Sequence, residues 1–201
     1  MQTPAFFDAV PPIVVVDPLG ETLGAAEGGV LEYRYIDAVK LTGHSCPTVA
    51  GAWLMTRTAL ARLYPQELPR RGEVQVELRQ ALDVGVAGVI ASVAALITGA
   101  ANEGGFKGLA GRFARDGRLR FGVPMTGEIR FTRLDTHQAV ELAHRPQVVP
   151  RPATLPALMA QALMPGADAP ARKAFADAWQ GWVQTLLIEH ADDPALIAVV
   201  N

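Results

Sequence analysis

The sequence contains a single cysteine, Cys46, among 201 residues. One cysteine excludes a disulfide within the chain, and it excludes both the C-x-x-C pairs of a zinc ribbon and the cysteine set of an iron–sulfur cluster. The first residues also lack the basic start, apolar run and small-residue cleavage site of a secretory signal. We therefore expect a cytoplasmic protein that folds without covalent cross-links.

An excess of charge of one sign is also absent, because 18 Lys and Arg are balanced by 20 Asp and Glu, a formal net charge of −2. We expect no nucleic-acid partner, since the chain has no excess of positive charge that would attract phosphate groups. The local excess of base is GRFARDGRLRFG, residues 111–122. We interpret its arginines as the solvated face of a hairpin rather than as an anion site: Arg112, Arg115, Arg118 and Arg120.

The longest apolar run covers residues 84–101 and is rich in Ala, Gly, Val and Ser, with Asp83 and Glu103 at its ends. A helix that faces lipid is usually richer in Leu and Phe, whereas small residues allow close packing inside a protein. We predict a helix buried in the core and no membrane partner.

Hydrophobic periodicity predicts a fold of the α+β class. Alternation of apolar and polar residues indicates half-buried strands, and apolar residues three and four apart indicate helices. The expected strands are 13–17, one that begins at residue 30, 73–82, 111–114, 119–123 and 127–134, and the expected helices are 47–63 and 86–98. The segment HQAVELAH extends the last strand or adds another.

A proline-rich segment divides the chain near its C-terminal quarter. PQVVPRPATLP, residues 146–156, contains four prolines and predicts an extended linker. We expect a core domain at residues 1–145 and a helical arm at residues 146–201. Trp179 and Trp182 fall at helical spacing in the second helix of this arm, which packs on its own core or on a second subunit. We expect a homodimer.

The segment KLTGHSCPTV, residues 40–49, carries the chemistry of this sequence. Pro47 suits the first position of a helix, so His44 and Cys46 lie at a helix N-terminus. Two functions fit this pair: a metal site, because imidazole and thiolate are both zinc or iron ligands, or a cysteine nucleophile with a histidine base. A lone cysteine is also often a small buried hydrophobe.

TGHSCPTVAGAWLM, residues 42–55, resembles the G-H-x-C-P motif of the FmdE family, which takes its name from a component of formylmethanofuran dehydrogenase. DVGVAGVIASVAALITGAANEGGFKG resembles the second block of that family, and the two blocks together span residues 35–131. The resemblance implies an FmdE/GAPDH-domain-like α+β core of helix, strand, helix and three strands that form a mixed β-sheet. It implies that His44 and Cys46 bind the metal, and it matches Thr98 and Gly99 to the start of the second block.

The second block departs from the family pattern, because Ala100 stands in place of its cysteine. Zinc takes about four ligands, so two protein ligands leave open positions for a small-molecule ligand. The candidates for a third ligand are Glu103, Asp37, His137 and His144. Lys107 takes the place of the loop lysine, and the glycines beside it let backbone N–H groups approach a small anion.

The leading hypothesis is therefore an FmdE-like protein that binds one zinc ion through His44 and Cys46 beside a glycine-rich ligand-binding loop. The resemblance does not supply a reaction. The alternatives are a metal-independent enzyme with Cys46 as nucleophile and a non-catalytic accessory or interaction subunit.

Overall fold

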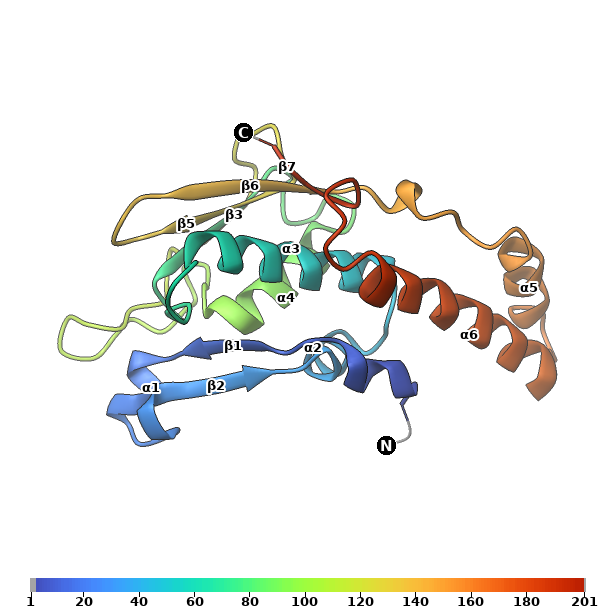
Figure 1. Ribbon diagram of the computed structural model, residues 1–201, viewed down its shortest axis with the longest axis horizontal. Helices are drawn as coiled ribbons and strands as arrows, with labels where there is room; N and C mark the ends of the chain where they lie inside the picture. Colours follow the sequence, from blue (N-terminus) through green and yellow to red (C-terminus); the bar gives the residue numbers. More distant parts are fainter. Residues whose placement is uncertain (1–2, 201) are drawn as a thin grey trace.

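The chain folds as an α+β protein, which a computed structural model describes for residues 3–200 (Figure 1). In chain order the elements are η1 (Ala5–Ala9), β1 (Ile13–Val16), α1 (Pro18–Thr22), η2 (Glu27–Gly29), β2 (Val30–Tyr33), α2 (Tyr35–Thr42), α3 (Pro47–Leu63), β3 (Val74–Leu78), α4 (Ala87–Thr98), β4 (Leu119–Arg120), β5 (Ile129–Arg133), β6 (Ala139–His144), η3 (Pro146–Val148), α5 (Leu155–Ala162), α6 (Ala169–Gln184), η4 (Thr185–Glu189) and β7 (Ile197–Val199). Figure 1 shows three layers: a sheet, the helices α3 and α4, and a ribbon of β1 and β2.

The main sheet has five strands in the order β4-β3-β5-β6-β7. The β3–β4 pair is parallel and the other pairs are antiparallel, so the sheet is mixed. Alternate residues of β5, among them Ile129 and Phe131, are buried beneath the helices, as the alternating pattern predicts. From α3 to β6 the order is helix, strand, helix and three strands, which confirms the α+β prediction.

The predicted buried helix is α4, and it packs against α3 and β3. Its small residues Ala91 and Ala94 are buried and allow close approach. Within residues 3–200 no helix combines the length and the apolar composition that a membrane crossing needs. A close approach on the other side of α3 also depends on a glycine: a Cβ at Gly51 would lie 2.3 Å from His144 Nδ1 on β6.

Two segments differ from the sequence prediction. Residues 111–114 form no strand, because Gly108, Gly111 and Phe113 all have positive φ and the chain coils instead of extending. The strand expected at 119–123 is only the two residues of β4, which join β3 in parallel rather than closing a hairpin. The segment HQAVELAH adds a separate strand, β6.

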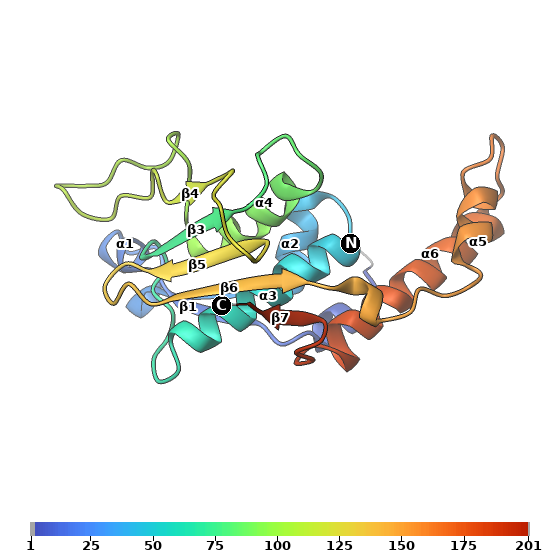
Figure 2. The same ribbon diagram turned by 90° about the horizontal axis from the view of Figure 1, so that it is seen from above.

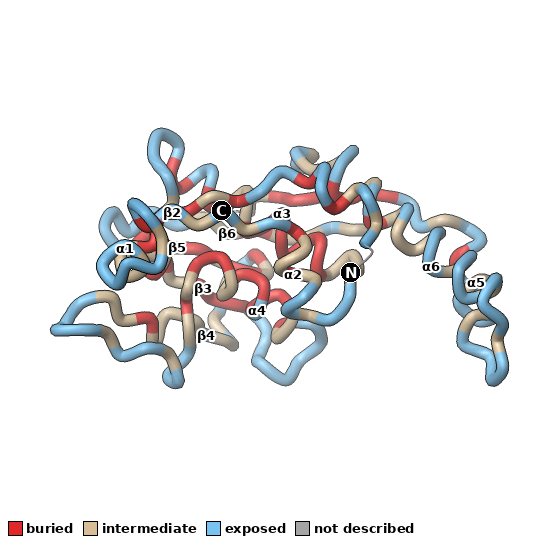
Figure 3. Tube along the Cα trace, turned by 90° about the horizontal axis from the view of Figure 1, so that it is seen from below, coloured by how far each residue is buried: buried red, intermediate tan, exposed pale blue. Residues whose placement is uncertain are grey.

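The C-terminal segment is part of the core as well as an arm. Beyond η4 the chain returns to the main sheet, where β7 pairs with β6. The second half of α6 and η4 bury Val183, Leu186 and Leu187 in the core. Figure 2 shows α5 and the start of α6 projecting away from the sheet, and Figure 3 shows most of this projection exposed. The arm therefore packs on its own core at one end only.

Candidate functional site

The G-H-S-C segment is a short connection between two helices. α2 ends at Gly43, whose φ of 75° is the left-handed conformation that glycine adopts without strain. α3 begins at Pro47 with Cys46 as its N-cap residue. Only three residues lie between Gly43 and Pro47, so His44, Ser45 and Cys46 are presented at the N-terminus of α3, as the sequence predicts.

The His44 ring is exposed and oriented by the backbone. Its Nδ1 lies 2.9 Å from the carbonyl oxygen of Thr42, so the tautomer that donates from Nδ1 satisfies this hydrogen bond. That tautomer leaves Nε2 with a free lone pair. Histidines that bind metals commonly hold their second nitrogen against a carbonyl in this way.

Cys46 is half-buried and lies at the positive end of the α3 dipole. The preceding Ser45 is buried, and its hydroxyl lies 3.0 Å from the hydroxyl of Tyr35. The same Ser45 anchors α6, since its carbonyl oxygen accepts hydrogen bonds from Trp179 Nε1 at 2.9 Å and Gln180 Nε2 at 3.2 Å. The backbone that carries His44 and Cys46 is therefore held from two sides.

His44 and Cys46 both line a pocket of about 540 Å³. The other walls are mostly apolar and come from the starts of α3 and α4, from the segment before α5 and from α6: Pro47, Thr48, Val86, Val89, Arg151, Trp179 and Trp182. The two indoles pack edge to face at 6.0 Å, and Trp182 Nε1 donates to the carbonyl of Val149 at 3.2 Å. We call this space the tryptophan pocket.

The tryptophan pocket was not predictable from the motif. Trp179 and Trp182 carry a helical spacing signal, but that signal does not say which surface the helix covers. The structure places them against a loop more than 130 positions earlier, as the separation of 134 residues between Trp179 and Ser45 shows.

The candidates for a third metal ligand lie elsewhere. In residues 3–200 no three His, Cys, Asp or Glu side chains are close enough together to hold a metal ion. The Asp37 carboxylate accepts the Arg34 backbone N–H at 2.9 Å, and Glu103 and His137 are exposed in separate loops. His144 packs against α3, where burial lowers its pKa to about 4.

The glycine-rich loop lies at the other end of α4 from His44 and Cys46. Val89 lines the tryptophan pocket, and the nine residues from there to Thr98 extend about 14 Å along the helix. Thr98 Oγ1 donates to the Ala94 carbonyl, and Lys107 pairs with Asp116 at 3.0 Å. The structure therefore does not bring Thr98, Gly99 or Lys107 to the His–Cys pair. Ala100 is also at this far end, so a cysteine there would not join the pair within one chain.

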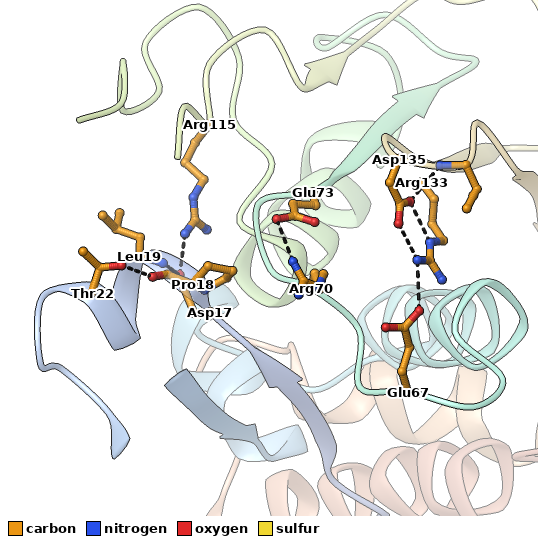
Figure 4. Close-up of polar contacts among 11 residues, drawn as sticks. Asp17, Pro18, Leu19, Thr22, Glu67, Arg70, Glu73, Arg115, Arg133 and Asp135 are labelled. Carbon is orange, nitrogen blue, oxygen red and sulfur yellow. Dashed lines mark hydrogen bonds and ion pairs between the residues drawn. The ribbon is translucent and has the colours of Figure 1, made fainter. Parts of the chain in front are cut away.

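A buried ion-pair cluster occupies that far end and was missed by the sequence interpretation. Asp17 Oδ2 accepts from Arg71 Nη1 at 2.9 Å. Asp17 Oδ1 accepts from Arg115 Nη2 at 2.7 Å (Figure 4). Burial opposes ionisation of Asp17, but hydrogen bonds from Gly20 N–H and Arg71 and the charge of Arg115 outweigh it, so its pKa is lowered. The prediction that Arg115 lies on a solvated strand face is wrong, because its side chain is 8% exposed.

Fold and site together define an α+β protein in which His44 and Cys46 both line a largely apolar pocket. No protein-family model and no curated protein matches this chain. The resemblance to the FmdE family therefore stays a prediction from the two sequence blocks.

Proposed function

We propose that this chain is an FmdE-like metal-binding protein in which His44 and Cys46 hold one divalent metal ion, zinc being the expected metal. The observation that carries the proposal is the orientation of His44, whose Nδ1 is occupied by the Thr42 carbonyl while both residues line the tryptophan pocket. An imidazole nitrogen and a thiolate are good zinc ligands.

The donor set fits an open site rather than a closed structural one. Two protein ligands leave about two positions of a tetrahedral zinc for solvent, a bound ligand or a second subunit. Bound zinc would supply a Lewis acid in the wall of a largely apolar pocket. The pocket walls favour a small molecule with an apolar body, and Arg151 offers a cation for an anionic end.

We also propose that the protein is a homodimer that uses the projecting arm. At the tip of this arm Leu163 and Met164 are 73% and 63% exposed, which is unusual for adjacent large apolar residues. Removing the whole arm would also remove β7 from the core sheet. The sharper test is Leu163→Asp with Met164→Asp, which we expect to convert a dimer into a monomer by light scattering; an unchanged mass, or a wild-type monomer, refutes the dimer proposal.

Metal content per chain, measured by mass spectrometry on untagged protein purified without chelator, tests the metal site. We expect near-stoichiometric metal in the wild type and its loss in His44→Ala and in Cys46→Ser. His137→Ala is the matched control, because this histidine is exposed in the turn between β5 and β6. Metal-free wild type, or metal retained in both variants, refutes the proposal.

Thiol alkylation separates the metal site from the alternative of a cysteine nucleophile. A metal-bound thiolate is shielded, so the alkylation rate of Cys46 should rise when a chelator is added. A nucleophile activated by His44 would react at the same rate with and without chelator, and its rate would fall in His44→Ala.

A further inference from the structure

A second pocket, of about 280 Å³, lies where the end of β1, the segment before β3 and the loop before β4 meet. Arginine is the dominant residue type of its walls: Arg70, Arg71, Arg112, Arg115 and Arg118. We call it the arginine pocket. It lies at the C-terminal end of α4, because the neighbouring Gly72 N–H donates to the Thr98 carbonyl. The tryptophan pocket is at the opposite end of this helix.

The positive charge of the arginine pocket is only partly neutralised. Asp17 pairs with Arg71. Figure 4 shows the pair of Asp17 with Arg115 and the pair of Glu73 with Arg70, the latter at 3.4 Å. Within residues 3–200 the other two arginines, at positions 112 and 118, form no ion pair with an acidic side chain. Five guanidinium groups and two carboxylates leave an excess of three positive charges around one cavity.

Arg115 is buried with hydrogen-bonding capacity unused. Its Nη2 binds Asp17, but Nε and Nη1 have no acceptor among the described residues, and neither has Nε of Arg71. Unpaired buried donors are costly and uncommon in native structures. The side chain is also held in place, since a Cβ at Gly72 would lie 2.7 Å from its Nε and one at Gly99 would lie 2.1 Å from its Nη1.

The concentration of positive charge also affects the neighbouring arginines. Burial, and then the charge of Arg115, lower the pKa of Arg118. Arg112 lies over the Phe113 ring at 4.7 Å, a cation–π contact that positions its guanidinium without neutralising it. A bound anion would relieve the repulsion between these guanidinium groups.

We propose that the arginine pocket binds the phosphoryl group of a small phosphorylated ligand. The excess of positive charge suits a dianion, and the planar guanidinium fork donates two parallel hydrogen bonds to phosphate oxygens. A cavity of about 280 Å³ holds a phosphoryl group and a small organic body. The site is independent of the proposed metal site, from which α4 separates it.

Calorimetric titration of the full-length chain with inorganic phosphate, at constant ionic strength maintained with chloride, tests the proposal. Arg118→Gln is the informative variant, because it removes a pocket arginine without breaking an ion pair. Arg120→Gln is the matched control: it removes the same charge two residues away, where the side chain is exposed and outside the pocket. Circular dichroism and urea unfolding check that each variant is folded.

We expect one phosphate per wild-type chain, affinity weakened at least about tenfold in Arg118→Gln, and affinity within about twofold of wild type in Arg120→Gln. No saturable binding, or equal weakening in the two variants, overturns the site. Glycerol phosphate binding at least as tightly as phosphate supports a phosphorylated ligand, whereas tighter binding of malonate overturns that assignment. We expect the phosphate affinity of His44→Ala to equal that of the wild type, which would show that the arginine pocket binds phosphate independently of the proposed metal site.

Discussion

Replacement of Asp17 by asparagine tests how much the buried ion-pair cluster at the C-terminal end of α4 stabilises the folded protein. Asp17 is 4% exposed and accepts four hydrogen bonds: from Leu19 N–H, Gly20 N–H, Arg71 and Arg115. The amide oxygen of asparagine keeps one acceptor for the helix cap of α1, so the cap contributes only a few tenths of a kcal/mol to the loss. The main loss is the charge that neutralises the two arginines.

The size of the effect follows from the burial of those arginines. Breaking a buried ion pair by removing one partner costs about 3–5 kcal/mol, because the remaining charge is left uncompensated. Arg115 is 8% exposed and carries this full penalty, whereas Arg71 is 22% exposed and is partly screened by solvent. We expect Asp17→Asn to lower the free energy of unfolding by about 3 kcal/mol.

Urea unfolding followed by tryptophan fluorescence measures this difference. Asp168→Asn is the matched control, because Asp168 also caps a helix, accepting Ala171 N–H at 2.8 Å, but is exposed. We expect it to cost less than about 0.5 kcal/mol. The reasoning is wrong if the two variants differ by less than about 1 kcal/mol. The pKa of Asp17 is lowered from 3.8, so its stabilisation is present above pH 4 and is lost as pH falls through the lower folded value.

Two further predictions concern the contact between Gly51 of α3 and His144 of β6. Gly51→Ala places a Cβ 2.3 Å from His144 Nδ1 and should lower the free energy of unfolding by about 2 kcal/mol. Gly181→Ala lies in open space on α6 and should raise the free energy of unfolding by about 0.5–1 kcal/mol. Equal urea midpoints for the two variants would contradict this prediction. Burial lowers the pKa of His144 from 6.5 to about 4, so the unfolded state binds the proton at higher pH than the folded state does. The contribution of His144 to the free energy of unfolding should therefore fall by about 3 kcal/mol between pH 6.5 and 4. His144→Asn should flatten that slope in urea titrations and His137→Asn should not; an unchanged slope in His144→Asn would show that His144 does not titrate as described.

Several elements were predictable from the sequence because their signals are local. The helix at 47–63 matches α3, since Pro47 suits a first helical turn and the apolar spacing continues to Leu63. The buried helix at 86–98 matches α4 within one residue, because the segment consists almost entirely of small or apolar residues. The connection that presents His44 and Cys46 was predictable for the same reason, since Gly43 and Pro47 terminate the helices on either side.

The tertiary structure alone decided which of these local pieces share a site. The sequence blocks place the glycine-rich loop beside the His–Cys pair, but α4 is a rod, and its length separates the two ends by more than a small ligand can span. Trp179 reaches Ser45 only because the chain folds back after α5, and Arg70 meets Arg115 only because three segments converge at one end of the sheet. Periodicity reports which face of an element is apolar, whereas the partner of that face depends on contacts between residues far apart in the chain.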